Sequence, residues 1–85
     1  MAYAISYASS AAKTLRKLDQ HTARRLLEII AKLARDPRPP GCIQLKGGAG
    51  EMRIRVGDHR IIYEIHDGEL VILVLRIGHL REAYR

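Results

Sequence analysis

Apolar and polar positions along the chain follow two different periods. In the segments 51–56 and 60–66 apolar residues largely alternate with polar ones, which is typical of half-buried strands. Between residues 9 and 35 they recur every three or four residues, which is typical of amphipathic helices. We therefore expect strands at about 3–7, 51–57, 60–66 and 70–77, and helices that end near Leu18 and Arg35.

Polar residues at the ends of these segments indicate where the helices begin and end. Ser9 or Ser10 is expected to cap the first helix, and Asp19 is expected to cap the second, which begins at Gln20. The proline-rich segment 36–41 ends the second helix, because proline cannot continue it. The apolar stripe expected on the second helix comprises Ala23, Leu26, Leu27, Ile30, Leu33 and Ala34.

The order strand, helix, helix, three strands predicts an α+β fold in one domain, residues 1–85. We expect an antiparallel twisted sheet with both N-terminal helices packed on one face. The apolar run from Leu70 to Leu75, within the strand expected at 70–77, is typical of a central strand. No element remains to cover the opposite face of the sheet, so chemistry or recognition is expected there.

A basic hairpin is the most informative part of the chain. Arg53 and Arg55 alternate with apolar residues and so share one strand face, Gly57-Asp58 supplies the turn, and Arg60 opens the returning strand. Arg76, near the end of the last strand, is expected on the same face. Guanidinium groups gathered in this way suit phosphate, because their fork of donors matches phosphate oxygens.

Charge and composition agree with a polyanion as partner. The 85 residues carry 15 Lys and Arg against 9 Asp and Glu, a formal charge of +6. This balance favours a nucleic acid, an acidic protein, or both in turn. The cations on the outer faces of the helices are interpreted first as a solvated surface rather than as an RNA-binding stripe.

Other features narrow the possible chemistry. Cys42 is the single cysteine, and no His, Cys, Asp or Glu spacing favours a metal, so no metal or cofactor is expected. The glycines after Lys46 lack the Lys-Ser/Thr of a phosphate-binding loop. The chain shows no signal-peptide pattern, and its longest apolar run is too short to span a bilayer. We therefore expect a cytoplasmic protein that does not associate with membranes.

The hairpin from Glu51 to Ile65 resembles the signature hairpin of the RelE/ParE toxin superfamily nearly residue for residue. That signature combines alternating basic residues, a glycine-aspartate turn, a further arginine and a tyrosine. The resemblance extends over the chain through the helix motif Ala11/Ala12, Lys13, Leu15, Lys17 and Leu18, the segment Leu45-Lys46-Gly47, and the tail from Val74 to Arg85.

This resemblance implies a microbial-ribonuclease-like fold and the toxin of a type II toxin–antitoxin pair. RelE-like members enter the ribosomal A site and cut mRNA there without a metal, by attack of a 2′-hydroxyl on the adjacent phosphate. ParE-like members share the fold and inhibit DNA gyrase without a nuclease site. A third possibility is a toxin whose activity has decayed and which regulates its own operon. Fold alone does not decide among these.

For the nuclease, the resemblance implies a set of site residues. The expected catalytic residues are Arg53, Arg55, Arg60, Arg81, Tyr84 and His79. The expected phosphate-binding residues are Arg53, Arg55, Arg60, Arg76 and Lys46. Some nuclease members have lysines where Arg53 and Arg55 stand, and arginine cannot serve as a base. Leu80 stands where the family has a tail arginine, which leaves the acid and base unassigned.

The resemblance also implies partners. The nuclease would act on the ribosome and mRNA, and a RelB-like antitoxin would hold it inactive. We expect that antitoxin to be acidic or to carry an amphipathic helix that masks the arginines. The toxin–antitoxin complex is expected to bind operator DNA.

Overall fold

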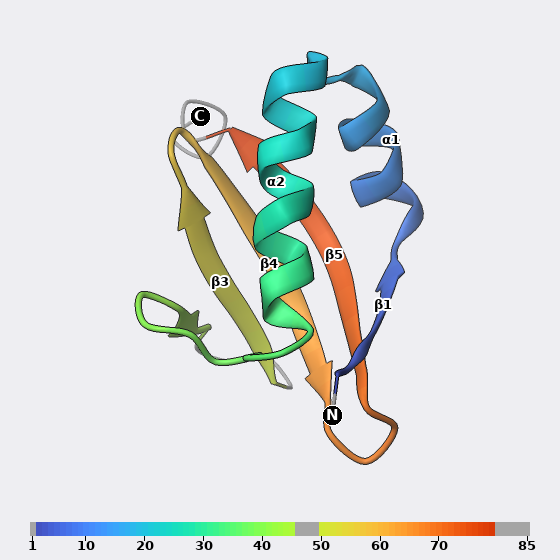
Figure 1. The fold of residues 1–85 in the computed structure, drawn as a ribbon, viewed down its shortest axis with the longest axis vertical. Coiled ribbons are helices and arrows are strands. Elements are labelled where there is room, and N and C mark those ends of the chain that lie inside the picture. Colours follow the sequence, from blue (N-terminus) through green and yellow to red (C-terminus); the bar gives the residue numbers. More distant parts are fainter. Residues whose placement is uncertain (1, 46–49, 80–85) are drawn as a thin grey trace.

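A computed structural model describes residues 2–45 and 50–79 of the chain, with two helices against a curved sheet (Figure 1). Its elements, in order, are β1 (Ala4–Tyr7), α1 (Ser9–Lys17), α2 (Gln20–Leu33), β2 (Ile43–Gln44), β3 (Glu51–Val56), β4 (His59–His66) and β5 (Val71–His79). The four predicted strands and both predicted helices are present, with ends shifted by at most two residues.

The five strands form one sheet in the order β1-β5-β4-β3-β2. The predicted α+β fold is confirmed, but the sheet is mixed rather than wholly antiparallel, because β1 runs parallel to β5. Parallel neighbours need a long connection between them, and here the helices and the β3–β4 hairpin supply it. A short strand that was not predicted, β2, pairs with β3 at the edge. The strand β5 is central, as predicted, with a neighbour on each side.

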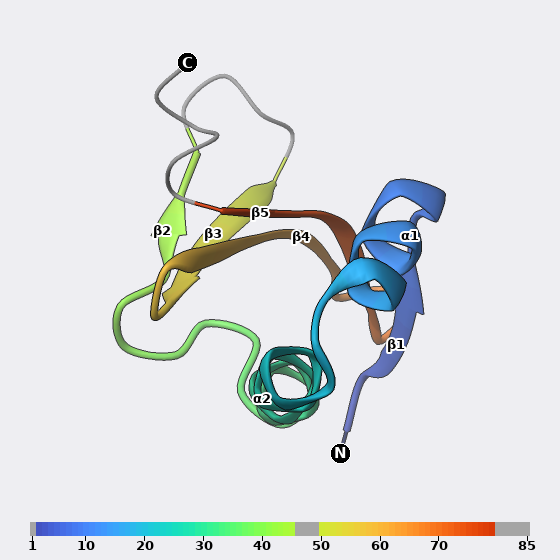
Figure 2. The same ribbon diagram turned by 90° about the horizontal axis from the view of Figure 1, so that it is seen from above.

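The core lies between the helices and one face of the sheet. In Figure 2, α2 lies on one side of the β3–β4–β5 layer and α1 lies at its β5–β1 end, and no described helix covers the other side. Burial of apolar side chains is the main stabilising contribution to such a fold. The buried residues are Ala11, Leu26, Ile30, Leu33, Met52, Val56, Ile61, Tyr63, Ile72, Val74 and Ile77.

The two helices begin in different ways. The side chain of Asp19 accepts a hydrogen bond from the backbone N–H of Thr22 at 3.0 Å, which confirms its predicted capping role. Hydrogen bonding from the side chain and then the backbone of Thr22 lowers the pKa of Asp19. The serine cap predicted for α1 is wrong, because Ala8 occupies the N-cap position and no side chain caps it. Ser10 instead donates from Oγ to the carbonyl of Leu75 at 3.0 Å, which ties α1 to β5.

The apolar stripe of α2 is narrower than predicted. Leu26 is 1% exposed, whereas Leu27 is 43% exposed and does not belong to the core. Successive helical residues are rotated by about 100°, so Leu26, Ile30 and Leu33 occupy the face toward the sheet and Leu27 points away from it.

Neither described helix is long and apolar enough to cross a membrane.

Adjacent leucines on α2 provide a matched test of this packing. We expect Leu26→Ala to lower the free energy of unfolding by about 2–5 kcal/mol, because it leaves a cavity in the core. Leu27→Ala should lower it by less than about 1 kcal/mol. Urea unfolding followed by circular dichroism measures both. Equal losses for the two variants would contradict the placement of α2.

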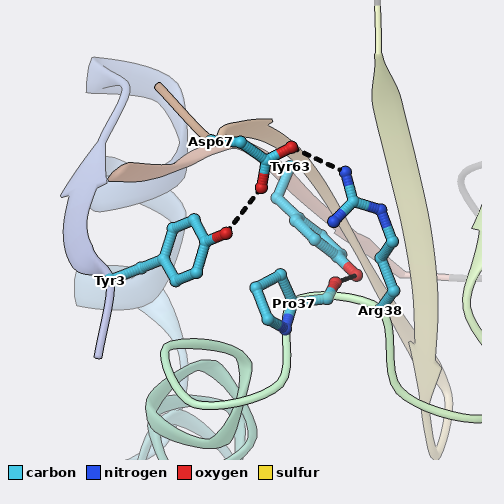
Figure 3. A network of polar contacts seen from close by, with 5 residues as sticks. All are labelled: Tyr3, Pro37, Arg38, Tyr63 and Asp67. Atoms are coloured by element: carbon cyan, nitrogen blue, oxygen red, sulfur yellow. Dashed lines mark hydrogen bonds and ion pairs between the residues drawn. The ribbon is translucent and has the colours of Figure 1, made fainter. Parts of the chain in front are cut away.

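A polar network joins three segments at the end of the sheet near the N-terminus (Figure 3). Tyr3 donates to one oxygen of Asp67 at 2.5 Å, and Arg38 contacts the other oxygen at 2.9 Å. Close by, the hydroxyl of Tyr63 donates to the carbonyl of Pro37 at 2.7 Å. The network therefore links the chain before β1, the segment between α2 and β2, and the turn between β4 and β5.

Both partners of the Tyr3–Asp67 hydrogen bond have shifted pKa values. Hydrogen bonds from Arg38 and Tyr3 lower the pKa of Asp67, because they stabilise its charged form. The hydrogen bond that Tyr3 donates to Asp67 raises the pKa of Tyr3, because it stabilises the protonated hydroxyl. A carboxyl group whose pKa is lowered by folding stabilises the fold above its unfolded pKa, and this contribution is lost as the pH falls through the folded pKa.

We therefore expect Asp67→Asn to lower the melting temperature at pH 7. The difference from the parent protein should shrink as the pH falls below about 4, near the unfolded pKa of aspartate, where Asp67 itself becomes protonated. Thermal unfolding at several pH values measures this. Asp58→Asn, in the exposed β3–β4 turn, is the matched control and should have little effect. A decrease in melting temperature that is the same at every pH would contradict an ionic role for Asp67.

Candidate functional site

The register of three neighbouring strands brings four arginines onto one sheet face. Arg55 of β3 is directly opposite Arg60 of β4, and Ile62 of β4 is directly opposite both Arg53 and Arg76. Residues directly opposite each other on neighbouring strands share a face, as do alternate residues of one strand. Arg53, Arg55, Arg60 and Arg76 therefore lie on the face turned away from the core, and we call this surface the arginine face.

In the part of the chain that the structure describes, no ion pair neutralises the arginines of the arginine face. None of its four guanidinium groups lies within 4.0 Å of a described carboxylate, whereas Arg38 and His66 do have acidic partners. Like charges directly opposite each other, as in the Arg55–Arg60 pair, destabilise a sheet. A face whose guanidinium groups have no described carboxylate within 4.0 Å is suited to an external anion.

Two details mark the neighbourhood of Arg60. Its Nε is buried and has no hydrogen-bond partner among the described residues, which costs about 1–3 kcal/mol for a buried donor. Gly78 is opposite Arg60 on β5, and a side chain placed there would meet no described atom within 4 Å. Arg55, by contrast, donates from Nε to the carbonyl of Gly57 at 3.3 Å, which orients it along the hairpin. Buried polar groups without a partner call for an explanation, and binding of an anion provides one.

A depression adjoins the arginines on the same face. It has a volume of about 310 Å³ and is lined by Ser10, Glu51, Ile62, Leu75 and Arg76. Ser10 was expected to cap the first helix, and no role in this site was predicted for Glu51. The alternation of residues 51, 53 and 55 already contained the signal, because it places Glu51 on the arginine face. The contribution of α1 to this depression could not be derived from any local pattern.

His79 lies on the other side of the sheet from the arginines. It is directly opposite His59, and the two rings meet edge to face with centroids 5.0 Å apart. Both histidines line a cavity with Leu18 and Ile77, on the face that the helices cover. The structure therefore does not bring His79 together with Arg53, Arg55 and Arg60, because alternation along β5 directs it to the opposite face.

Several predicted site residues lie outside the residues that the structure describes. These are Lys46, Arg81 and Tyr84, together with Leu80, the departure from the family pattern. Among the described residues, no group of three or more His, Cys, Asp or Glu side chains could hold a metal ion. The described part of the site is thus a cationic surface whose evident chemical capacity is to bind and stabilise anionic oxygens.

Comparison with known families identifies the chain. The family model described as the ParE toxin of type II toxin–antitoxin systems, parDE, matches residues 5–84. The chain belongs to this toxin family. The match spans every described element except the first residue of β1, so it covers the hairpin that carries three of the four arginines.

Relatives of this ParE-family toxin agree with that assignment. It is 28% identical over 86 residues to Toxin RelG of Mycobacterium tuberculosis, covering 100% of this chain and 99% of the relative. The toxin–antitoxin complex RelBE2 of Mycobacterium tuberculosis matches with a TM-score of 0.82 and 26% identity, covering 93% and 99% of the two chains. The archaeal RelE–RelB complex of Pyrococcus horikoshii OT3 matches with a TM-score of 0.82 and 29% identity, covering 94% and 97%. The protein is thus a type II toxin of the RelE/ParE group.

The arginine face of the ParE-family toxin should respond to salt as a phosphate-binding surface. Each phosphate neutralised on a single strand contributes a slope of about −0.7 to the dependence of log affinity on log salt concentration. We expect Arg53→Ala to reduce the magnitude of this slope by about that amount, measured by fluorescence anisotropy with single-stranded RNA. The control Arg24→Ala, on the exposed side of α2, should change it much less. A larger change from Arg24→Ala would place the RNA on the helices.

Proposed function

We propose that this toxin is a metal-independent endoribonuclease that cuts ribosome-bound mRNA in the A site and so inhibits translation. The observation that carries the proposal is the arginine face, where four guanidinium groups from three strands lie without a described carboxylate within 4.0 Å. Its likeness to a solved RelE–RelB complex at 29% identity favours a RelE-like activity. The likeness to Toxin RelG is consistent with it.

The reaction would proceed by transfer of the phosphate within the RNA. The 2′-oxygen loses its proton to a base and forms a bond to phosphorus, and the bond from phosphorus to the 5′-oxygen breaks as that oxygen receives a proton. The products are a 2′,3′-cyclic phosphate and a 5′-hydroxyl. Arg53, Arg55 and Arg60 would bind the phosphate and stabilise the extra negative charge of the transition state. A preorganised donor of this kind can contribute roughly 3 kcal/mol.

Proton transfer is assigned to the C-terminal tail. Tyr84 occupies the position of the family's tail tyrosine. Arg81 stands second in the family's tail arginine pair, after Leu80, and would replace the missing first arginine if the tail shifts by one position. Lys46 would add a phosphate contact. Arginine cannot act as a base, so the arginine face supports the electrostatic part of the mechanism and leaves the proton acceptor to another group. The position of His79 on the helix-covered face argues against its direct participation beside the arginines.

An antitoxin is the partner that we propose for regulation. Both solved structures described above are toxin–antitoxin complexes. A RelB-like antitoxin with an acidic segment would complement the arginine face and keep RNA out of it. The same complex would bind operator DNA.

Inhibition of DNA gyrase is the second candidate, and two observations favour it. The family model that matches the chain is that of the ParE toxin. Leu80 also stands where nuclease relatives carry an arginine. In this case the arginine face would be a binding surface for protein or DNA and would perform no chemistry.

Primer extension on mRNA in a translating extract tests the proposal. The protein should produce new cuts at A-site codons, and these cuts should disappear when translation is blocked. Arg60→Ala should reduce cutting by about a hundredfold or more, because it removes a donor from the transition state. Arg24→Ala, which leaves the arginine face intact, should cut like the parent protein.

Absence of cuts by the folded parent protein would contradict the nuclease. Gyrase-linked cleavage of supercoiled DNA would then identify the second candidate. Activity in neither assay would indicate that the toxin activity has been lost.

A further inference from the structure

The depression beside the arginines has a composition that phosphate binding does not explain. Its floor includes apolar Ile62 and Leu75, while Glu51 and Arg76 stand at opposite sides of it, on β3 and β5. A carboxylate repels phosphate, so Glu51 does not belong to a surface built for phosphate alone. The depression therefore suits another part of a nucleotide.

The separation of Glu51 and Arg76 is important to this argument. Their strands flank β4, and Glu51 is opposite Glu64 whereas Arg76 is opposite Ile62. Their backbones are therefore more than two strand spacings, or about 10 Å, apart, because they are also offset along the strands. Among the described residues, no cation lies within 4.0 Å of the Glu51 carboxylate, so this acid is not used in an ion pair with Arg76. An acceptor and a donor thus lie diagonally across a depression whose lining includes apolar Ile62 and Leu75, with room for a flat, polar molecule between them.

The bases of RNA differ in how well they match this arrangement. Guanine presents two adjacent donors, N1–H and the N2 amino group, which match the two oxygens of a carboxylate. It also presents two acceptors, O6 and N7, which match the fork of an arginine. Unpaired RNA bases are commonly recognised on these edges while their faces contact apolar or planar side chains. Adenine and cytosine offer only one amino group to a carboxylate, and uracil offers only its N3–H.

We propose that the depression is a guanine-binding subsite, in which Glu51 and Arg76 read the base while Ile62 supports its face. This inference rests on the proposed function in taking RNA as the ligand. It adds which base adjoins the bound phosphate and which residues select it, and it assigns Arg76 to the base instead of to the phosphate contact expected from the sequence. Arg53, directly opposite Ile62, places the phosphate-binding surface next to the base.

Binding of uncut RNA tests this subsite separately from cleavage. The probes are fluorescein-labelled pentanucleotides with deoxyribose throughout, which lack the attacking 2′-hydroxyl and differ only in the central base among adenines. At low ionic strength, the probe with central guanine should bind roughly tenfold more tightly than the other three, as expected for a bidentate contact. Glu51→Gln and Arg76→Gln should each reduce this preference to less than about threefold.

Two control variants separate base reading from general charge effects. Arg53→Ala should weaken binding of all four probes alike and leave the guanine preference unchanged. Glu69→Gln removes an exposed carboxylate in the β4–β5 turn. It should change neither the guanine preference nor the ranking of the four probes by affinity. A guanine preference near one in the parent protein, or a preference that survives Glu51→Gln, would overturn the subsite.

The outcomes for cleavage and for base preference are independent. A protein that prefers guanine but cuts no mRNA would contradict the proposed nuclease and support the subsite. A protein that cuts mRNA but binds all four probes equally would contradict the subsite alone.

Discussion

The pairing register of β3, β4 and β5 is the constraint on which both the core and the candidate site depend. Side chains alternate between the faces of a sheet, so one register directs Met52, Ile61 and Ile77 to the helices and the arginines to the other side. A shift of one residue would exchange the two sets. The burial of the apolar set strongly opposes such a shift. The hydrophobic core thus holds the four arginines together although like charges repel.

The two ends of the sheet have different polar chemistry. Near the N-terminus, Asp67 neutralises Arg38 and accepts from Tyr3, so charge is balanced within the fold. On the arginine face, Arg60 has a buried Nε without a partner among the described residues. Local strain and unsatisfied polar groups are tolerated where other interactions support them, and they concentrate at functional sites. The contrast supports a structural role for the first region and a binding role for the second.

Much of the fold could be predicted from the sequence because its signals are local. The alternation in β3 and β4 and the Gly57-Asp58 turn determine the hairpin, and with it the shared face of Arg53, Arg55 and Arg60. The features that were missed depend on contacts between distant segments. The parallel pairing of β1 with β5 and the use of Ser10 to hold Leu75 have no local signature. Leu27 satisfies the helical period approximately, and only the position of α2 on the sheet excludes it from the core.

The candidate site could be predicted in part for the same reason. His79 was expected among the catalytic residues, yet the alternation of β5 puts it on the face opposite the arginines. Glu51 shares the arginine face through simple alternation, but its significance depends on Arg76, which only the sheet order brings near. A family resemblance indicates which residues are shared with other members of the family. The pairing register of β3, β4 and β5 shows which of these residues lie on one face and can contact the same bound molecule.

The central claim is that the arginine face itself receives the RNA phosphate. Nuclear magnetic resonance of the arginine Nε–H groups tests it most directly, during titration with a single-stranded oligonucleotide that lacks 2′-hydroxyls. We predict that the signals of Arg53, Arg55, Arg60 and Arg76 shift, with Arg60 moving in the direction of a newly formed hydrogen bond, while Arg38 beside Asp67 stays in place. Shifts confined to the arginines of α1 and α2 would contradict the account.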